Sequence, residues 1–499
     1  MTEQGDGYVA PMDHSRAPIL DAMLEFRRRG DIVYTPPGHK QGRGADPRVI
    51  EVLGREVFLS DVLTTGGLDD RTSSKGLLQE AQELMADAVN ADTAFFATAG
   101  SSLSVKTAML SVAAHGDELL VARNIHKSVV SGLVLAGIRP VWVDPVWDTE
   151  LEIAHPPAVE AVERAWDAHP DAKGLLHIGP TDYGVASDLA AVVEACHRRE
   201  KPIIADEAWG AHLPFHDALP TWGMNADADV VVTSVHKAGS AFEQSSVFHL
   251  KGRRVDPVLL KQREDLLSTT SSSSLVYAAL DGWRRQMVEQ GRGLIDHALK
   301  HAQALRDGIN AIDGLHAVTV AELLARPGVH EVDPYHVLIE VHGLGITGYQ
   351  AADWLRPHHR VGVGLSDHRR IAALITHGDD DETVARLVDA LADLARHAGE
   401  LDPSPRVHIP SPEHLDLETV MLPRDAFFGP TEVVPADQAV GRVAAELATP
   451  YPPGVPVLVP GDLITAEAVD YLRSGVAAGM QLPDPTDPKL EKIKVVATG

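Results

Sequence analysis

Residues 201–212 read KPIIADEAWGAH, and residues 228–237 read ADVVVTSVHK. Each segment is a short apolar run that ends in polar side chains, a pattern typical of a buried strand. Asp206 ends the first run, and Lys237 follows the second run 31 residues later. Upstream, residues 95–102 read FFATAGSS, an apolar run that leads into small and hydroxyl side chains. We therefore expect three strands that bring chemically useful groups to one sheet.

Strand-like and helix-like segments alternate through the first 250 residues. The runs typical of strands are 95–97, 118–122, 140–143, 174–178, 202–205 and 229–233. Amphipathic spacing predicts helices over 103–112 and over 189–199. Strands separated by helices indicate βαβ units, so this part is predicted to be an α/β domain with a mainly parallel sheet.

The pattern changes after about residue 285. Apolar spacing predicts a long helix over 293–312, strands at 337–341, 362–364 and 371–375, and a helix with an acidic first turn over 380–394. This arrangement is typical of a smaller α+β domain. We divide the chain into an N-terminal segment (1–34), a large domain (35–290), a small domain (291–396), a Pro-rich linker (397–416) and a C-terminal α+β domain (417–499).

Composition excludes several classes of protein. The 499 residues include 44 Lys and Arg and 71 Asp and Glu, a formal charge of −27 that disfavours nucleic acid as a partner. No run approaches 18 apolar residues, so no membrane partner is expected, and the first 30 residues lack the pattern of a secretory signal. Cys196 is the single cysteine and cannot form an intramolecular disulfide. We expect a cytoplasmic protein.

The three strand ends together are suited to pyridoxal 5′-phosphate. A lysine such as Lys237 can form a Schiff base with the cofactor, and a carboxylate such as Asp206 can keep the pyridine nitrogen protonated. A turn of Gly100, Ser101 and Ser102 before a helix offers N–H and hydroxyl donors to a phosphate. Ser234 and His236 could add donors. Each feature alone is common in loops and helix caps, and the prediction rests on their combination.

The chain resembles the Orn/Lys/Arg decarboxylase family of pyridoxal-phosphate enzymes, in a short form without an N-terminal wing domain. The resemblance extends over about 420 residues, from TPPGHKQG (35–42) to VPVLVPGD (455–462). Between them lie GLDDR (67–71), AQELMA (81–86), RNIHKSV (123–129), GPTDYG (179–184), DEAWGAHLPFH (206–216), SVHK (234–237), LLSTTSSSS (266–274), LPRDAF (422–427) and YPPGVP (451–456). This family has fold type I, in which the aspartate aminotransferase-like large domain binds the cofactor.

The resemblance implies roles for individual residues. Lys237 matches the Schiff-base lysine, Asp206 the partner of the ring nitrogen, and His126 the histidine that stacks on the ring. The phosphate site corresponds to Ser101, Ser102, Ser234 and His236, and Trp209 and His212 fall in the stretch that flanks the ring. Thr269, Thr270 and Ser271 resemble a hydroxyl cluster that reaches the phosphate of the neighbouring subunit. A homodimer or larger homo-oligomer with shared sites is therefore expected.

The implied reaction is decarboxylation of arginine, lysine or ornithine to the corresponding amine and CO₂, a step of diamine or polyamine formation. Such a substrate needs an acidic receptor for its distal cation. Two departures from the family pattern provide candidates: Glu243, six residues past Lys237, and Asp462, in the C-terminal Pro-Gly-Asp. A third departure, Ala99 before Gly100, removes an amide from the phosphate turn but keeps the hydroxyls.

Three other interpretations are open to the same residues. An aminotransferase would bind the substrate carboxylate with an arginine of the small domain, for which Arg370 is the candidate. An oxidative decarboxylase-deaminase would use the same cofactor. A regulator that only binds the cofactor would have no need of both Lys237 and Asp206. A metal site at His358 and His359 is disfavoured, since the sequence lacks the Cys/His spacing of a zinc site.

Overall fold

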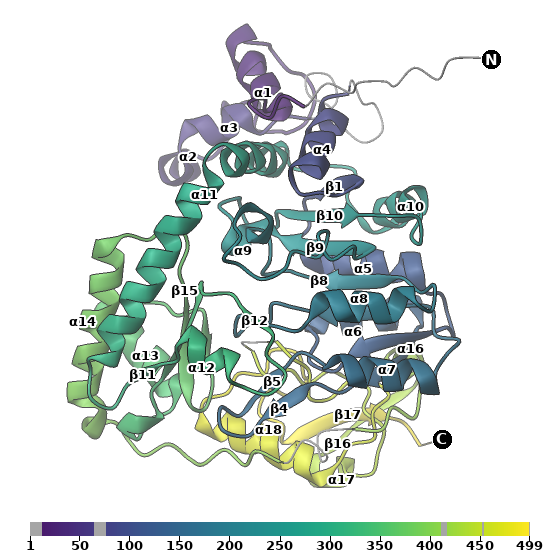
Figure 1. The fold of residues 1–499 in the computed structure, drawn as a ribbon, viewed down its shortest axis with the longest axis vertical. Coiled ribbons are helices and arrows are strands. Elements are labelled where there is room, and N and C mark those ends of the chain that lie inside the picture. Colours follow the sequence, from purple (N-terminus) through teal and green to yellow (C-terminus); the bar gives the residue numbers. More distant parts are fainter. Residues whose placement is uncertain (1–11, 64–75, 411–416, 452–453, 499) are drawn as a thin grey trace.

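The computed structural model describes residues 12–63, 76–410, 417–451 and 454–498. A seven-stranded sheet with the order β1-β10-β9-β8-β6-β2-β3 forms its centre (Figure 1). The bounds are β1 Thr93–Ala97, β2 Glu118–Ala122, β3 Arg139–Val143, β6 Leu175–Ile178, β8 Ile203–Asp206, β9 Val230–Ser234 and β10 Ser246–Leu250. Strands β9, β8, β6, β2 and β3 are parallel, so the predicted α/β fold with a mainly parallel sheet is confirmed.

Each strand predicted in the first 250 residues corresponds to one of these strands within one or two residues. Of the strands in the central sheet, only β10 was not predicted. It lies antiparallel between β1 and β9. Only the one-turn helix α9 (Val235–Ala238) and a loop separate β9 from β10, and so short a connection returns the chain beside the strand that it left.

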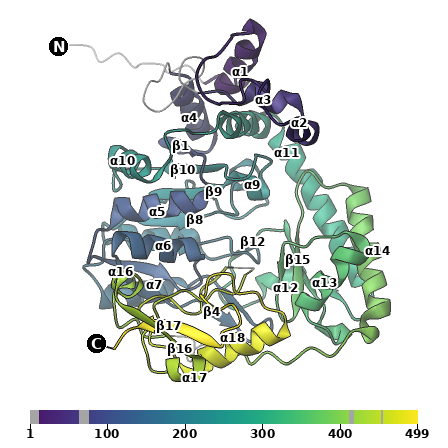
Figure 2. The ribbon, with the colours of Figure 1, turned by 180° about the vertical axis from the view of Figure 1, so that it is seen from behind.

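Helices cover both faces of the central sheet. Helices α7 (Val159–Ala168) and α8 (Leu189–His197) lie on the face seen in Figure 1, whereas α5 (Ser101–Val112) and α6 (Lys127–Ala136) lie on the opposite face, seen in Figure 2. Helix α10 (Pro257–Leu267) packs beside α5. Completely buried side chains such as Trp166 of α7 and Val130 of α6 form the two apolar layers between helices and sheet. The residues at the strand ends remain available for a site.

The small unit contains a second, antiparallel sheet of order β11-β13-β15-β14. Its strands are β11 His316–Ala317, β13 His336–Glu340, β15 Arg370–Leu374 and β14 Leu365–Ser366. Helix α13 (Gly348–His359) and the end of α11 (Ser274–Asn310) pack on it, and α14 (Asp381–His397) packs on these two helices. The strand predicted at 362–364 is wrong: Gly362 and Gly364 offer no side chain to pack, and the pairing begins at Leu365.

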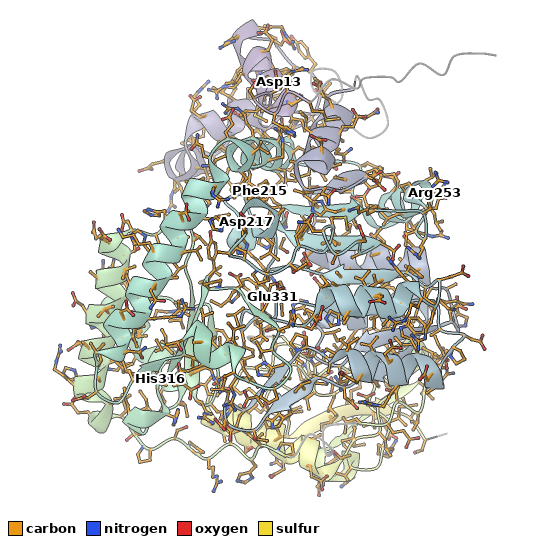
Figure 3. The ribbon with its side chains drawn as sticks, viewed as in Figure 1. Asp13, Phe215, Asp217, Arg253, His316 and Glu331 are labelled. Carbon is orange, nitrogen blue, oxygen red and sulfur yellow. The ribbon has the colours of Figure 1, made fainter. Side chains whose placement is uncertain are left out.

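The large and small units are joined by more than the chain connection. The 37-residue helix α11 runs through both, so the boundary that we propose after residue 290 lies inside a continuous helix. Strand β12 (Glu331–Val332) pairs with β7 (Val185–Ala186). The Glu331 carboxylate, labelled in Figure 3, also accepts hydrogen bonds from the Thr221 backbone N–H at 2.7 Å and hydroxyl at 2.9 Å. These contacts fix the position of the small unit relative to the large unit, and the site lies between the two.

Two further parts enclose this body. At the N-terminal end, α1 (Pro18–Arg29), α2 (Pro47–Leu53), α3 (Arg55–Ser60) and α4 (Leu77–Ala88) gather around the start of α11. The C-terminal part contains α16 (Pro423–Phe428), the antiparallel pair β16 (Thr431–Pro435) and β17 (Lys492–Val496), α17 (Ala436–Ala439) and α18 (Ala466–Ala478). Among the residues that the structure describes, no helix has the length and apolarity needed to cross a membrane.

Candidate active site

A cavity of about 570 Å³ lies where the carboxyl ends of the central strands face the small unit. Helix α9, which carries Lys237, lies between the central sheet and β15 in Figure 1. Asp206 is the last residue of β8, the parallel neighbour of β9, so the two strands bring this carboxylate and Lys237 to one edge of the sheet. The turn from β1 into α5 brings Gly100, Ser101 and Ser102 to the same cavity.

Lys237 faces an aromatic wall. Its Nζ lies 4.0 Å from the centroid of the Trp209 ring, a cation–π contact. Burial lowers the pKa of Lys237 from its ordinary value, and the charges of Asp182 and Asp206 partly oppose this change. A lysine with a lowered pKa has a larger fraction of neutral amine, the form that reacts as a nucleophile.

Asp206 is almost completely buried, with 2% of its surface exposed. Its Oδ1 accepts a hydrogen bond from the Ala208 backbone N–H at 3.2 Å. Burial raises the pKa of Asp206 to about 6, against the opposing charge of Lys237. A buried carboxylate with few partners is stabilised by a cation placed beside it, so this position favours a protonated ring nitrogen.

Hydroxyl groups converge at the start of α5. Ser234, at the end of β9, donates from its Oγ to the Oγ of Ser101 at 2.6 Å. Gly100 has a φ of +75°, a left-handed conformation that glycine adopts without strain and that turns the chain into the helix. Because the N–H groups of a helix's first turn have no partner within the helix, this corner can bind a phosphate. His236 lines the same cavity and donates from Nδ1 to the backbone oxygen of Ser245 at 3.1 Å.

His126 forms part of the opposite wall and precedes α6 as its N-cap. Its Nδ1 accepts a hydrogen bond from the Ser128 backbone N–H at 3.2 Å, which holds the ring in place. Burial and the nearby charge of Lys237 lower the pKa of His126 to about 4. At neutral pH the ring is therefore uncharged, the form suited to stacking on a flat heterocycle.

The chain was compared with known proteins. Residues 17–383 match the family described as Orn/Lys/Arg decarboxylase, major domain, and residues 413–484 match its C-terminal domain. An arginine decarboxylase of Halalkalibacterium halodurans is 40% identical over 485 residues, which cover 96% of this chain and 98% of that protein. The chain belongs to the Orn/Lys/Arg decarboxylase family. It is thus an amino acid decarboxylase, a carboxy-lyase, as the resemblance implied.

More distant relatives of this decarboxylase confirm the fold. The constitutive lysine decarboxylase of Escherichia coli is 24% identical over 582 residues, covering 97% of this chain and 80% of that protein. The crystal structure of the Francisella novicida lysine decarboxylase superposes with a TM-score of 0.81 at 19% identity, covering 96% of this chain and 81% of that one. The architecture is that of fold type I enzymes, as predicted.

The structure of the decarboxylase brings most of the predicted site residues together. Gly100, Ser101, Ser102, His126, Asp206, Trp209, Ser234, His236, Lys237 and Glu243 all line the one cavity. Glu243 is exposed and belongs to the loop between α9 and β10. The GLDDR motif and two prolines of YPPGVP lie outside the described residues.

Two predicted residues, His212 and Asp462, do not line the cavity of the decarboxylase. His212 is 1% exposed: its Nε2 lies 3.2 Å from Oδ2 of Asp333, and its ring stacks on Tyr335 beneath the site. Asp462 is completely buried, where it accepts hydrogen bonds from the Thr419 hydroxyl at 2.6 Å and the Val459 N–H at 3.0 Å. Both side chains are held by packing and internal bonds, so neither faces a ligand in this cavity.

Thr270 and Ser271, predicted to reach a neighbouring subunit, do not line the cavity of their own chain. Both are exposed in the connection between α10 and α11, where the Ser271 N–H donates to the Thr269 hydroxyl at 3.0 Å. Their contribution to a second subunit stays a prediction.

Arg370, the residue on which an aminotransferase interpretation depended, is completely buried. Its guanidinium pairs with Glu340 at 3.1 Å and with Asp367 at 3.0 Å, and it contacts the backbone oxygen of Leu151. An arginine already bound to two carboxylates and absent from the cavity wall is not placed to clamp a substrate carboxylate. This geometry removes the observation that favoured transamination.

Asp182 and His336 are among the residues of the cavity wall that our sequence reasoning missed. Asp182, in GPTDYG after β6, accepts the Trp209 indole N–H at 2.8 Å, and His336 of β13 donates from Nδ1 to the Asp182 backbone oxygen at 3.0 Å. The rule that identified Asp206 and Lys237 could have identified Asp182, because β6 is the next parallel strand. His336 comes from the small unit, and nothing in its local sequence signals this position.

Proposed function

We propose that this decarboxylase releases CO₂ from L-arginine, with pyridoxal 5′-phosphate bound at Lys237. The observation that carries the proposal is the pairing of a buried lysine and a buried carboxylate at adjacent strand ends, in one cavity with a hydroxyl-rich helix start. Arginine is favoured over lysine because the relative at 40% identity is named an arginine decarboxylase, whereas the lysine decarboxylase reported above is at 24%.

The residues present fit this cofactor. Lys237 would hold its aldehyde carbon, Asp206 its ring nitrogen, and Ser101, Ser102, Ser234 and His236 its phosphate; His126 and Trp209 would enclose its ring. The fit is tested at Asp206. Its buried carboxylate has no cationic group bonded to it among the described residues, and a protonated ring nitrogen would supply one. When bound, the cofactor would supply a protonated aromatic ring able to take up the electron pair left by departing CO₂.

The chain's own groups would then perform three tasks. Asp206 would keep the proton on the ring nitrogen by its adjacent negative charge. His126, uncharged and fixed by Ser128, would hold one face of the ring without adding a charge of its own. Lys237 Nζ, buried beside Trp209, would carry a proton to the carbon from which CO₂ has left.

Glu243 is the candidate receptor for the substrate guanidinium. Glu243 lines the cavity, and among the described residues no charged side chain forms an ion pair with its carboxylate. The wall also contains Asp182 and Asp206, so the site is acidic overall and attracts a cation. Because Glu243 is exposed, its pairing energy is moderated by water.

The reaction class is tested by incubating the purified holoenzyme with L-arginine, L-lysine and L-ornithine in turn. CO₂ and amine in equal amounts, formed fastest from arginine and without ammonia, are expected. A keto acid would indicate transamination, and ammonia with peroxide would indicate oxidative deamination; either result overturns the proposed reaction. A higher kcat/KM for lysine or ornithine would overturn only the choice of arginine.

Replacing Glu243 by glutamine should raise KM for L-arginine, since the guanidinium loses its counter-charge. We expect kcat/KM to fall about tenfold, equivalent to about 1.4 kcal/mol, the lower part of the range for a charge pair because the carboxylate is exposed. The neutral isostere citrulline should be affected much less. Steady-state kinetics with both compounds give the comparison.

Asp462→Asn is the comparison variant for Glu243→Gln, because it removes a carboxylate that does not line the catalytic cavity and that lies 3.6 Å from Arg123 Nη2. It should lower the thermal stability, through the loss of a buried hydrogen-bonded charge, and leave the arginine-to-citrulline ratio of kcat/KM unchanged. Equal effects of Glu243→Gln on both compounds would show that this carboxylate is not the receptor.

A shared site predicts complementation between two inactive chains. We expect the Lys237→Ala chain and the Thr270→Ala/Ser271→Ala chain, mixed after subunit exchange, to regain activity, because the heterodimer contains one site with both sets of groups intact. Random pairing limits the recovery to about a quarter of wild-type activity. Activity that never exceeds that of the Thr270→Ala/Ser271→Ala protein alone would contradict the crossing of these hydroxyls.

A further inference from the structure

A second cavity, of about 370 Å³, lies behind the catalytic one. The turn after β2, the hairpin of β4 (Val146–Asp148) and β5 (Ile153–His155), the small unit and the C-terminal part all contribute to its wall. Asp182 is common to the walls of both cavities. The catalytic proposal above uses none of the other residues of this second wall.

Buried polar atoms in this wall lack partners. Asn124 is 5% exposed, and neither Oδ1 nor Nδ2 of its amide has a hydrogen-bond partner in the part of the chain that the structure describes. The Nε of Arg123, 9% exposed, also has none, although the terminal nitrogens of the same side chain donate to the backbone oxygens of Pro456 at 2.8 Å and Val457 at 3.1 Å. Buried donors and acceptors that are left unpaired destabilise a protein, so their retention at a cavity wall points to a ligand.

The remaining wall determines what kind of ligand fits. Donors at Arg123 Nε and Asn124 Nδ2 suit the oxygens of a carboxylate. Beside aliphatic residues such as Val455 and Met480, the wall contains aromatic and acidic side chains, which suit a cation. These aromatic and acidic members are Asp144, Trp147, Glu152, Asp182, Tyr183, Tyr349, Asp367 and Tyr471. These acids also have partners within the chain: Glu152 pairs with His368 at 2.6 Å, Asp367 pairs with Arg370 at 3.0 Å, and Asp182 accepts the Trp209 indole N–H at 2.8 Å.

We propose that this cavity binds a free basic amino acid as a zwitterion, at a site separate from the catalytic one. Its carboxylate would accept hydrogen bonds from Arg123 Nε and Asn124 Nδ2, and its ammonium or guanidinium end would lie among the tyrosines and Asp182. The separate site rests on this geometry alone, whereas the choice of L-arginine as the preferred ligand rests on the proposed function.

Asp182 gives the second site a physical connection to the first. Its Oδ1 bonds to the Trp209 indole, and the Trp209 ring lies against Lys237. A cation bound beside Asp182 would compete for the same carboxylate and change the surroundings of Lys237. The expected consequence is that the rate departs from hyperbolic dependence on the concentration of the amino acid, that is, regulation by substrate.

Counting bound ligands separates the two sites. Lys237→Ala protein loaded with pyridoxal 5′-phosphate does not consume L-arginine, so radiolabelled L-arginine can be measured at equilibrium by dialysis. Absorbance of the cofactor reports occupancy of the catalytic cavity alone. We expect two L-arginine molecules per chain, of which only one changes the absorbance. One molecule per chain with a normal absorbance change overturns the second site and leaves the proposed function intact, whereas no absorbance change overturns the proposed function.

Asn124→Leu, combined with Lys237→Ala, locates the second site. The bound L-arginine should fall from two to one per chain with the absorbance change retained. Without ligand this variant should melt at the same or a higher temperature than its parent, because leucine removes two unpaired polar atoms from a buried place. Two bound molecules in a folded Asn124→Leu protein would overturn this location, and the count in the Lys237→Ala parent tests the second site independently of any Asn124 variant.

Asn310→Leu is the matched control. The Asn310 amide donates to the Ala317 backbone oxygen at 3.1 Å and accepts from the Ala317 N–H at 2.7 Å, so both of its polar atoms are paired. This substitution should lower the melting temperature and keep two bound molecules. The product amine, which lacks a carboxylate, should displace L-arginine from the second site at least tenfold less well than L-lysine does; equal displacement would overturn the role given to Arg123 and Asn124.

Discussion

Replacing Lys237 by alanine should abolish decarboxylation while the fold is retained. The side chain would both hold the cofactor and carry a proton at the reacting carbon, so two functions are lost together. We expect kcat to fall by at least about ten-thousand-fold, equivalent to about 5.4 kcal/mol in the activation barrier. The visible absorbance of the lysine-bound cofactor should disappear from the resting protein, and borohydride should no longer fix the cofactor to the chain.

Lys251→Ala is the control for this experiment. Lys251 follows β10 of the same sheet, donates to the Met224 backbone oxygen at 2.7 Å and pairs with Asp227 at 2.8 Å, and does not line the cavity. That variant should keep the absorbance band and the activity. A cofactor still fixed by borohydride in the Lys237→Ala protein would mean that another amine holds it.

The Asp206→Asn variant should bind the cofactor but turn over slowly. Asparagine keeps the shape of the side chain and loses the negative charge that would keep the ring nitrogen protonated, and an unprotonated ring is a poorer acceptor of electrons. We expect kcat to fall by about two to four orders of magnitude, equivalent to about 3–5 kcal/mol. Kinetics under saturating L-arginine, with the absorbance spectrum recorded in parallel, measure both effects.

The neighbouring Glu207 supplies a stringent control. It is 1% exposed and lies outside the cavity wall, and burial raises its pKa well above the usual value. Glutamine keeps the shape of the side chain at a position that does not line the cavity, and Glu207→Gln should therefore change kcat by no more than about twofold. Comparable losses in both variants would mean that Asp206→Asn merely disturbs the end of β8.

The confirmed strand predictions depended on patterns that are local in the chain, whereas the confirmed family depended on a series of motifs over about 420 residues. Apolar runs of four or five residues identified the strands that end at Asp206 and Ser234, because buried parallel strands are apolar on both faces. The same rule missed β10, whose place between β1 and β9 depends on a return of the chain that no local pattern encodes. It also failed at residues 362–364, where two glycines stand in an apolar context but pack nothing.

For the cavity, the order of residues predicted the place of Lys237, Asp206 and the hydroxyl turn, since each follows a strand and strand ends of one sheet meet, whereas His126 was predicted only from the resemblance to the family. The order of residues could not distinguish Glu243 from Asp462, or Trp209 from His212: both members of each pair have the right chemistry near a motif. Only the folded chain shows that Asp462 bonds inward to Thr419 and that His212 packs on Tyr335. Likewise, only the folded chain places His336 at the catalytic cavity and leaves the buried amide of Asn124 without a partner among the described residues. Burial and hydrogen-bond satisfaction depend on the packing of segments that are distant in sequence.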